Sequence, residues 1–208
     1  MRFLLFLALL LISIPLAAQQ IPDDPYKVTP ILINTTIPDV TVKTVAGEDI
    51  SLHEVVKEKP TIFVFYRGGW CPYCSRHMAE LAQVEEELID LGFQIAGISV
   101  DRPEVLRKTL TDVKLDYMLL SDSPANAIKA FGLAFTVDQA TVTRYKEVGI
   151  DLEADSGYDH HILPVPAVYF VDTDGNIDFQ YVNPNYRERI SGEILMAAAR
   201  TFMDSKAD

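Results

Sequence analysis

Apolar and polar positions follow the periods of strands and helices along most of this chain. Continuous apolar runs at 61–66 and 93–100 have the composition of strands buried on both faces. Between them, apolar residues recur at spacings of three and four from Met78 to Leu91, which predicts an amphipathic helix, and Gly92 is placed to end it. A strand, a helix and a strand in this order predict a parallel pair with a crossover helix.

Weaker periodic segments flank this unit and predict an α/β sandwich with a mixed sheet. Hairpins are expected at 40–52 and around Asp174-Gly175, whereas 132–163 shows no clear period. The other expected elements are a helix from Asp101 or Pro103, a strand at 116–120, a helix from Ser123-Pro124 to Phe131, strands at 167–171 and 177–182, and a helix capped by Ser191 with Ile194, Leu195, Ala198 and Phe202 on its apolar face. Asp101 and Asp122 follow strands and are expected to cap helices.

The N-terminus has the pattern of a targeting segment. Arg2 precedes an apolar run at 3–16, and small residues follow it, which predicts a signal peptide at 1–18. The run is too short to cross a bilayer core of about 30 Å as a helix, although an uncleaved anchor is the alternative. We expect a linker at 19–36, one domain at 37–208, and export to the periplasm or the outside of the cell.

Composition and charge narrow the choice of partners. The chain has 208 residues, of which 49% are hydrophobic and 23% charged, as in ordinary globular proteins. Its formal charge of −12 argues against nucleic acid or anionic lipid as a partner, because phosphate recognition needs clustered cations. Two cysteines exclude a disulfide-rich scaffold and leave one bridge, a reactive pair or two inert thiols.

Both cysteines lie in Cys71-Pro72-Tyr73-Cys74, between a predicted buried strand and an amphipathic helix. A cysteine at a helix N-terminus faces unpaired backbone N–H groups and the positive end of the helix dipole, which favour the nucleophilic thiolate. Pro72 suits the first helical turn. Because Cys74 lies almost one turn later, its sulfur can reach Cys71. We expect Cys71 to be the exposed attacking thiol and Cys74 the more buried resolving thiol.

Other interpretations of this motif stay open. A structural bridge or two inert thiols would need no chemistry, and a zinc site would need about four ligands. The four histidines form no spaced ligand pair, so we expect no metal and no other cofactor. His160 and His161 are either bases near the thiols or solvated loop residues. Arg67 and Arg76 either add positive potential or are solvated, and Trp70 either positions substrate or packs at the end of the sheet.

The segment from Phe65 to Cys74 resembles the active-site segment of peroxiredoxin-like proteins of the alkyl hydroperoxide reductase / thiol-specific antioxidant (AhpC/TSA) family. Further similarity lies at 38–40, 98–101, 120–122, 163–167, 172–175 and 183–187. The resemblance implies a thioredoxin-like fold, with a central mixed β-sheet flanked by helices and an N-terminal β-hairpin. It also implies that Pro166 is cis and that its loop faces the cysteines to position substrate.

In that family, a peroxidatic thiolate attacks a hydroperoxide, and a second thiol converts the resulting sulfenic acid into a disulfide. The resemblance makes Cys71 peroxidatic, Cys74 resolving and a thioredoxin-like protein the reductant. Gly68 stands where the family carries Thr or Ser, and Val64 where it carries Pro. We hypothesise that Arg67 and backbone N–H groups replace the missing hydroxyl.

Two enzymatic functions therefore stay open, together with a non-catalytic binding module that the intact cysteine pair argues against. The first is a thioredoxin-dependent peroxide reductase. The second is an exported thiol–disulfide oxidoreductase, because a Cys-Pro-Tyr-Cys dithiol suits exchange with protein or small-molecule disulfides.

Overall fold

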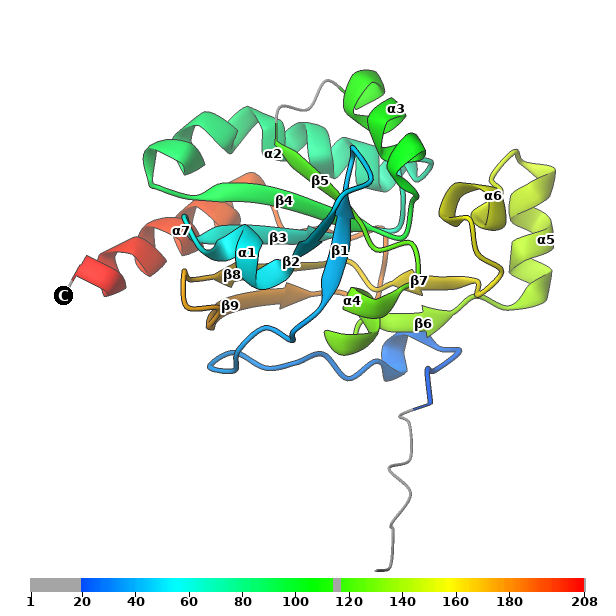
Figure 1. Cartoon of the computed structure of the whole chain (residues 1–208), viewed down its shortest axis with the longest axis horizontal. Helices are drawn as coiled ribbons and strands as arrows, with labels where there is room; N and C mark the ends of the chain where they lie inside the picture. The colour runs from blue at the N-terminus through cyan, green and yellow to red at the C-terminus, as the bar shows by residue number, and fades with distance from the viewer. Residues whose placement is uncertain (1–19, 114–116, 208) are drawn as a thin grey trace, which may run out of the picture.

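The computed structural model describes residues 20–113 and 117–207 (Figure 1), so the predicted signal peptide at 1–18 lies outside the described residues. The strands are β1 (Thr41–Thr44), β2 (Asp49–Ser51), β3 (Thr61–Phe65), β4 (Gln94–Ser99), β5 (Met118–Ser121), β6 (Ala134–Thr136), β7 (Ile162–Pro164), β8 (Ala167–Val171) and β9 (Ile177–Val182). The helices are α1 (Leu52–Val56), α2 (Pro72–Asp90), α3 (Pro103–Val113), α4 (Asn126–Ala130), α5 (Gln139–Glu147), α6 (Leu152–Ser156) and α7 (Gly192–Ala207), with a short 3-10 helix at Pro25–Lys27.

Seven strands form the central mixed sheet in the order β2-β1-β5-β4-β3-β8-β9, and β6 and β7 form a separate antiparallel pair. The strands β3, β4 and β5 are parallel, while β8 pairs antiparallel with β3 and β1 antiparallel with β5. Both predicted hairpins, β1–β2 and β8–β9, are present. The α/β fold with a central mixed sheet is confirmed, as is the parallel pair that α2 connects.

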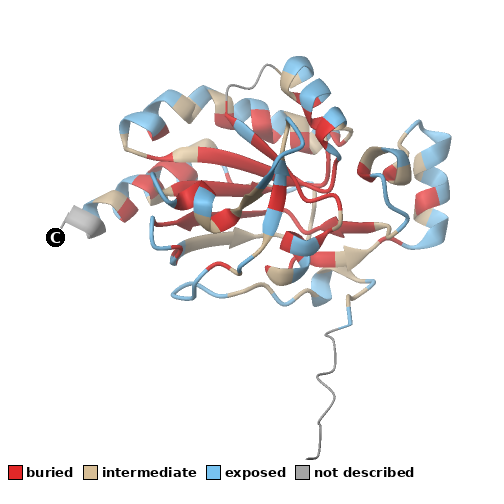
Figure 2. Cartoon of the chain, viewed as in Figure 1, coloured by how far each residue is buried: buried red, intermediate tan, exposed pale blue. Residues whose placement is uncertain are grey.

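Two apolar cores cover the two faces of this sheet. One contains side chains of α2, α3 and α7, and the other contains side chains of α1 and α4 together with the β6–β7 pair. The strands β3 and β8 are buried along their whole length (Figure 2), as their continuous apolar composition predicts. None of the described helices combines the length and the apolar character needed to span a membrane.

Three expected helical features are wrong. The helix after β5 begins at Asn126 rather than at Ser123-Pro124, because the Asp122 carboxylate accepts the N–H groups of Ala127 and Ile128 at 3.0 and 2.9 Å. Asp101 does not cap α3, since its carboxylate binds a loop near the cysteines. Ile194 is 58% exposed, so it does not belong to the buried face of α7, although Ser191 does accept its N–H.

The stretch without a clear period folds into β6, α5, α6 and β7. The helices α5 and α6 lie together at one end of the sheet (Figure 1), and Lys146 of α5 pairs with Glu153 of α6. These helices have few apolar positions, and β6 and β7 have three residues each. Such short segments carry too little periodicity to be recognised.

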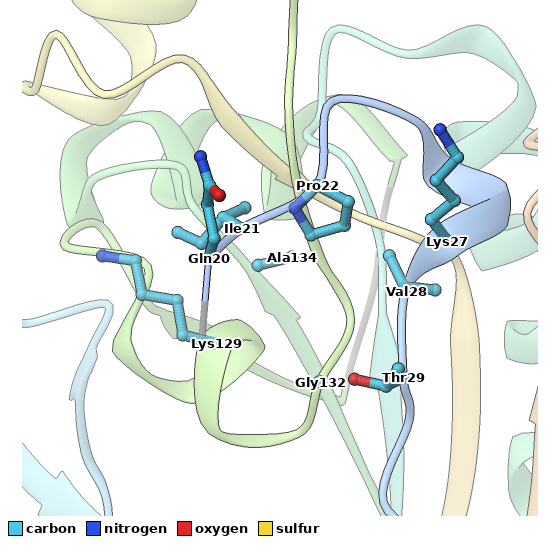
Figure 3. Close-up of a pocket in the computed structure, with 9 residues that line it drawn as sticks. All are labelled: Gln20, Ile21, Pro22, Lys27, Val28, Thr29, Lys129, Gly132 and Ala134. Atoms are coloured by element: carbon cyan, nitrogen blue, oxygen red, sulfur yellow. The ribbon is translucent and has the colours of Figure 1, made fainter. Parts of the chain in front are cut away.

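Residues 20–36, part of the expected linker, lie against the domain. The Ile31 N–H binds the Phe131 carbonyl, and the Thr136 N–H binds the Pro22 carbonyl. Gly132 has a φ of +67°, and a Cβ there would lie 2.0 Å from the Thr29 carbonyl oxygen, so the close approach requires glycine. A pocket of about 360 Å³ lies beside this contact (Figure 3), with Ile21 among the residues that line it.

We predict that Asp122→Ala lowers the free energy of unfolding by about 3 kcal/mol, because two buried N–H groups lose their acceptor. The measurement is urea denaturation at mildly acidic pH, below the pKa of about 6 to which burial raises this carboxyl, because at higher pH the cost of its ionisation in the folded state would offset the loss. Asp138→Ala is the matched control. It removes an exposed cap that accepts from Thr141, and we expect a clearly smaller loss. Equal losses in the two variants would contradict the prediction.

Candidate active site

The cysteine pair lies where β3 passes into α2. Cys71 is the N-cap residue of α2, in an extended conformation, and Pro72 is the first helical residue, as predicted. The Cys71 carbonyl accepts the N–H groups of Cys74 and Ser75 at 2.9 and 3.0 Å. The sequence therefore places one thiol at the helix N-terminus and the second almost one turn along the same helix.

Both thiols are free and buried. Cys74 is 0% exposed, which confirms it as the more buried thiol, but Cys71 is only 2% exposed. The prediction that Cys71 is exposed is therefore wrong. The core between the sheet and α2 extends to the first residue of the helix and includes both sulfurs. A substrate must reach Cys71 through a narrow opening or after a local movement.

The two thiols have opposite pKa shifts. The Cys74 thiol donates a hydrogen bond to the Cys71 sulfur, and this contact, opposed by burial and aided by the Cys74 N–H, Arg67 and Arg189, lowers the pKa of Cys71 to about 6. Burial, followed by the hydrogen bond to Cys71, raises the pKa of Cys74 well above its usual value. Near neutral pH, Cys71 is therefore the thiolate and Cys74 the thiol.

Arg189 and Arg67 supply the positive charge beside the sulfurs. One Arg189 guanidinium nitrogen lies 3.5 Å from the Cys74 sulfur. Arg67 is only 4% exposed, so the interpretation of Arg67 as a solvated charge is wrong. Its guanidinium lies 4.3 Å from the ring centre of Tyr186, 5.2 Å from that of Trp70 and 5.8 Å from that of Tyr145. These rings partly replace the hydration that Arg67 has lost.

Trp70 and Arg76 have different environments. Trp70 is half-buried, and its ring centre lies 5.7 Å from that of Tyr145, so it joins the aromatic group around Arg67. Arg76 is exposed and lies 5.7 Å from the Tyr73 ring centre. Of the two arginines near the cysteines in sequence, Arg67 is therefore part of the site and Arg76 lies on the surface.

The backbone before Cys71 is fixed by a buried carboxylate. One Asp101 oxygen accepts the Gly69 N–H at 2.8 Å. Gly68 has a φ of +154°, and a Cβ there would lie 2.2 Å from the Trp70 indole nitrogen and 2.8 Å from Asp101. No hydroxyl-bearing residue fits this position without displacing Trp70 and Asp101. The departure of Gly68 from the family pattern therefore follows from the packing around it.

Pro166 lies between β7 and β8, beside the cysteine site. It lines a cavity of about 550 Å³ together with Arg67, Tyr145 and Tyr186. The prediction of a cis bond is wrong, because no peptide bond in residues 20–113 and 117–207 is cis. The trans form is intrinsically favoured by roughly 0.5–1 kcal/mol. In this form the Val165 N–H donates to the Leu133 carbonyl and the Pro166 carbonyl accepts the Asn183 N–H, so the backbone on both sides of the bond is paired.

His160 and His161 are engaged away from the sulfurs. His160 accepts the Ile162 N–H at one ring nitrogen, so its other nitrogen donates to the Ser123 carbonyl. His161 lies 2.8 Å from Glu153. With both ring nitrogens of His160 in use and its pKa lowered by burial, the structure does not support it as a base for the thiols.

Sequence reasoning does not assign four residues to the site: Asp101, Tyr145, Tyr186 and Arg189. Asp101 and Tyr186 fall in the similar segments at 98–101 and 183–187, and Arg189 lies just after the second of these. Tyr145 lies in the stretch without a clear period. Their places depend on how α5 and the segment after β9 approach α2.

Comparisons with known proteins assign the chain to a family. The family model described as "AhpC/TSA family" matches residues 33–180. The chain is 28% identical over 88 residues to "Thiol-disulfide oxidoreductase ResA" of Halalkalibacterium halodurans, which covers 42% of this chain and 49% of that protein. It is 29% identical over 158 residues to "Peroxiredoxin Q, chloroplastic" of Gentiana triflora, which covers 76% of this chain and 62% of that protein. It thus spans between 49% and 62% of the length of these relatives.

A solved structure shows the same fold. The reduced Prx3 of Vibrio vulnificus in complex with H₂O₂ superposes with a TM-score of 0.66 at 18% identity, covering 81% of this chain and 99% of that one. At this identity the likeness establishes the architecture, and the thioredoxin-like fold of peroxiredoxins is confirmed.

We predict that iodoacetamide modifies Cys71 of the reduced protein with a midpoint near pH 6, because the thiolate is the reacting form. Cys74 should stay unmodified until the protein unfolds. Arg189→Gln should move the midpoint to higher pH, since it removes a positive charge that lowers the pKa of Cys71. Arg200→Gln, an exposed site paired with Glu87, is the control. A wild-type midpoint near the ordinary cysteine value of about 8.5 would contradict the prediction.

We also predict that Asp101 contributes a loss of stability as the pH rises from about 4 to about 7. Burial raises the pKa of Asp101 to about 7, so the folded state holds a proton that the unfolded state has already released. Asp101→Asn keeps an oxygen for the Gly69 N–H and should remove this contribution, so the difference in stability between the variant and wild type should grow over this pH range. The variant should be the more stable protein above pH 7, by a few kcal/mol at most.

Urea denaturation across this pH range tests the Asp101 prediction. Asp112→Asn is the control, because Asp112 is an exposed partner of Lys108. Parallel stability profiles for wild type and Asp101→Asn would contradict the prediction, because they would show that ionisation of Asp101 costs the folded state little free energy.

Proposed function

The chain belongs to the AhpC/TSA family, and on this premise we propose that it is a thiol peroxidase in which Cys71 is the peroxidatic and Cys74 the resolving cysteine. The observation that carries the proposal is the hydrogen bond from the Cys74 thiol to a Cys71 sulfur whose pKa lies near 6. An ionised nucleophile and its resolving partner are then already in contact before any peroxide arrives.

The reaction follows from this arrangement. The Cys71 thiolate attacks one peroxide oxygen, the O–O bond breaks, and the leaving alkoxide or hydroxide takes up a proton, which gives a sulfenic acid. Cys74 then attacks the Cys71 sulfur, its own proton is released, and the sulfenic hydroxyl leaves as water. The product is a Cys71–Cys74 disulfide, and two further electrons from a dithiol restore both thiols.

The environment of Cys74 suits the second step. Its pKa is raised by burial, by its hydrogen bond to Cys71 and by the negative charge of Cys71, so Cys74 stays protonated while Cys71 is the thiolate. Oxidation of Cys71 removes that charge. Arg189, which lowers the pKa of Cys74, then favours its ionisation. The pair is thereby activated in sequence, first Cys71 and then Cys74.

Arg67 takes the role of the hydroxyl that Gly68 cannot supply. Its Nε atom is buried and has no hydrogen-bond partner, so it is free to donate to a peroxide oxygen. The Cys71 and Cys74 N–H groups already donate to backbone carbonyls. We therefore assign peroxide positioning chiefly to Arg67, with Trp70 and the Pro166 segment as neighbours that shape the approach.

The reductant we propose is a thioredoxin-like dithiol protein, and the place of action is the periplasm or the exterior of the cell. The first rests on the peroxiredoxin relatives and on the intramolecular disulfide that the mechanism produces. The second rests on the signal-peptide pattern at 1–18 alone.

A second function, thiol–disulfide exchange, is favoured by the same dithiol and by the similarity to ResA. A lowered pKa at the attacking thiol and a raised pKa at its partner serve disulfide substrates equally well. Insulin reduction by the reduced protein, set beside peroxide consumption, separates the two activities.

We predict that hydrogen peroxide oxidises the reduced protein to a Cys71–Cys74 disulfide, followed by stopped-flow fluorescence of Trp70 and by peptide mass mapping. Cys71→Ser should slow peroxide consumption by roughly a hundredfold or more, because the nucleophile is lost. Cys74→Ser should stop at the sulfenic acid, which dimedone traps. Ser75→Ala is the matched control within the same turn of α2. Peroxide consumption at the wild-type rate by Cys71→Ser would refute the peroxidase proposal.

A further inference from the structure

The cavity that Arg67 and Pro166 line is unusually rich in arginine for so acidic a protein. Its volume of about 550 Å³ lies in the range of small-molecule sites. Three arginines line it, Arg67, Arg144 and Arg187, in a chain whose formal charge is −12. They come from the loop before α2, from α5 and from the segment after β9, so the fold gathers cations from three separate segments at one place.

None of these arginines forms an ion pair with a carboxylate among the described residues. Arg187 lies over the Tyr186 ring, and Arg144 donates to the Thr141 hydroxyl. Arg67 donates to the Tyr145 hydroxyl, while its buried Nε atom has no partner. Arg67 is only 4% exposed, and the anion that offsets its burial is the Cys71 thiolate, whereas Arg144 and Arg187 have no anionic partner in the described part of the chain.

The two acidic residues that line the cavity do not neutralise its arginines. Asp138 also lines it, but its carboxylate accepts the N–H of Thr141 as the cap of α5. Asp23 lines the cavity and is exposed. Neither carboxylate pairs with an arginine of the cavity in the described part of the chain.

The remaining walls include aromatic rings and prolines as well as threonines. Tyr145 and Tyr186 present their rings beside Arg67, and Pro166 lies among the lining residues. Hydrogen peroxide is far smaller than this cavity and carries no charge. The lining fits an organic molecule with an apolar body and an anionic group, because rings and prolines bind the body while guanidinium groups bind a carboxylate.

We infer that this cavity binds the carboxylate of an organic hydroperoxide and so selects anionic substrates over neutral ones. The inference rests on the proposed function for its reaction, in which Cys71 attacks the hydroperoxide and an alcohol that keeps the carboxylate leaves. The binding itself requires only the cavity, so the two proposals can fail separately.

Benzoate tests the binding without any reaction at sulfur. The chain has one tryptophan, Trp70, whose ring centre lies 5.2 Å from the Arg67 guanidinium carbon, so its fluorescence reports on an occupied cavity. Benzoate, titrated at constant ionic strength, should change this fluorescence saturably, and benzyl alcohol at the same concentrations should not. Equal responses to the two compounds, or none to benzoate, would overturn the inference.

Variants locate the binding site. Arg144→Gln combined with Arg187→Gln should weaken benzoate binding by about tenfold or more, because charge-assisted hydrogen bonds are lost. Both arginines are exposed, so the fold should tolerate these changes. Arg200→Gln, exposed and paired with Glu87, removes a positive charge on α7 and should leave binding unchanged. Equal weakening in the control would show only a general effect of net charge and would overturn the inference.

Kinetics connect the cavity to the reaction. The rate constant for Cys71 oxidation by a para-carboxylated cumene hydroperoxide should exceed that for cumene hydroperoxide by about tenfold, and the excess should vanish in the double variant. If hydrogen peroxide oxidises Cys71 but the two organic peroxides react equally, the substrate inference fails and the peroxidase proposal stands. If benzoate binds but no peroxide oxidises Cys71, the peroxidase proposal fails and the anion site stands.

Discussion

The hydrogen bond between the two thiols organises the chemistry of this protein. A thiolate at Cys71 lies in an apolar core, where burial alone would raise its pKa. The Cys74 thiol, two arginines and the start of α2 reverse that effect. Because these groups come from α2, from the loop before it and from the segment after β9, the thiolate is stable only in the folded protein.

The buried carboxylate of Asp101 holds the loop before Cys71 in place. Asp101 binds the Gly69 N–H and lies so near Gly68 that a Cβ there would come within 2.8 Å of its other carboxylate oxygen. Burial makes the ionised form of Asp101 unfavourable, so this support weakens global stability at high pH while it fixes the position of the nucleophile. A cost in stability of this kind is expected at a functional site, where the position of a reactive group is under stronger selection than stability.

Position 68 lacks a hydroxyl because of the packing around it. A Cβ there would lie 2.2 Å from the Trp70 indole nitrogen, so Trp70 takes the space that a longer side chain would need. A guanidinium surrounded by aromatic rings lies nearby and retains an unused donor. Within a chain of net negative charge, this concentration of cations gives the site a local potential opposite to that of the protein as a whole.

The sequence by itself determined the mixed sheet, the crossover helix and the place of the cysteine motif, because long apolar periods and a motif at a strand–helix junction depend only on local spacing. It also indicated that Cys74 is the deeper thiol. The elements within 132–163 are short and mostly polar, so the pattern could not reveal them. Only the tertiary structure decided that Cys71 is buried, that Pro166 is trans, that Asp101 supports a loop instead of capping a helix, and that Arg189 and Tyr145 meet the site. These outcomes depend on contacts between segments distant in sequence, which no local pattern records.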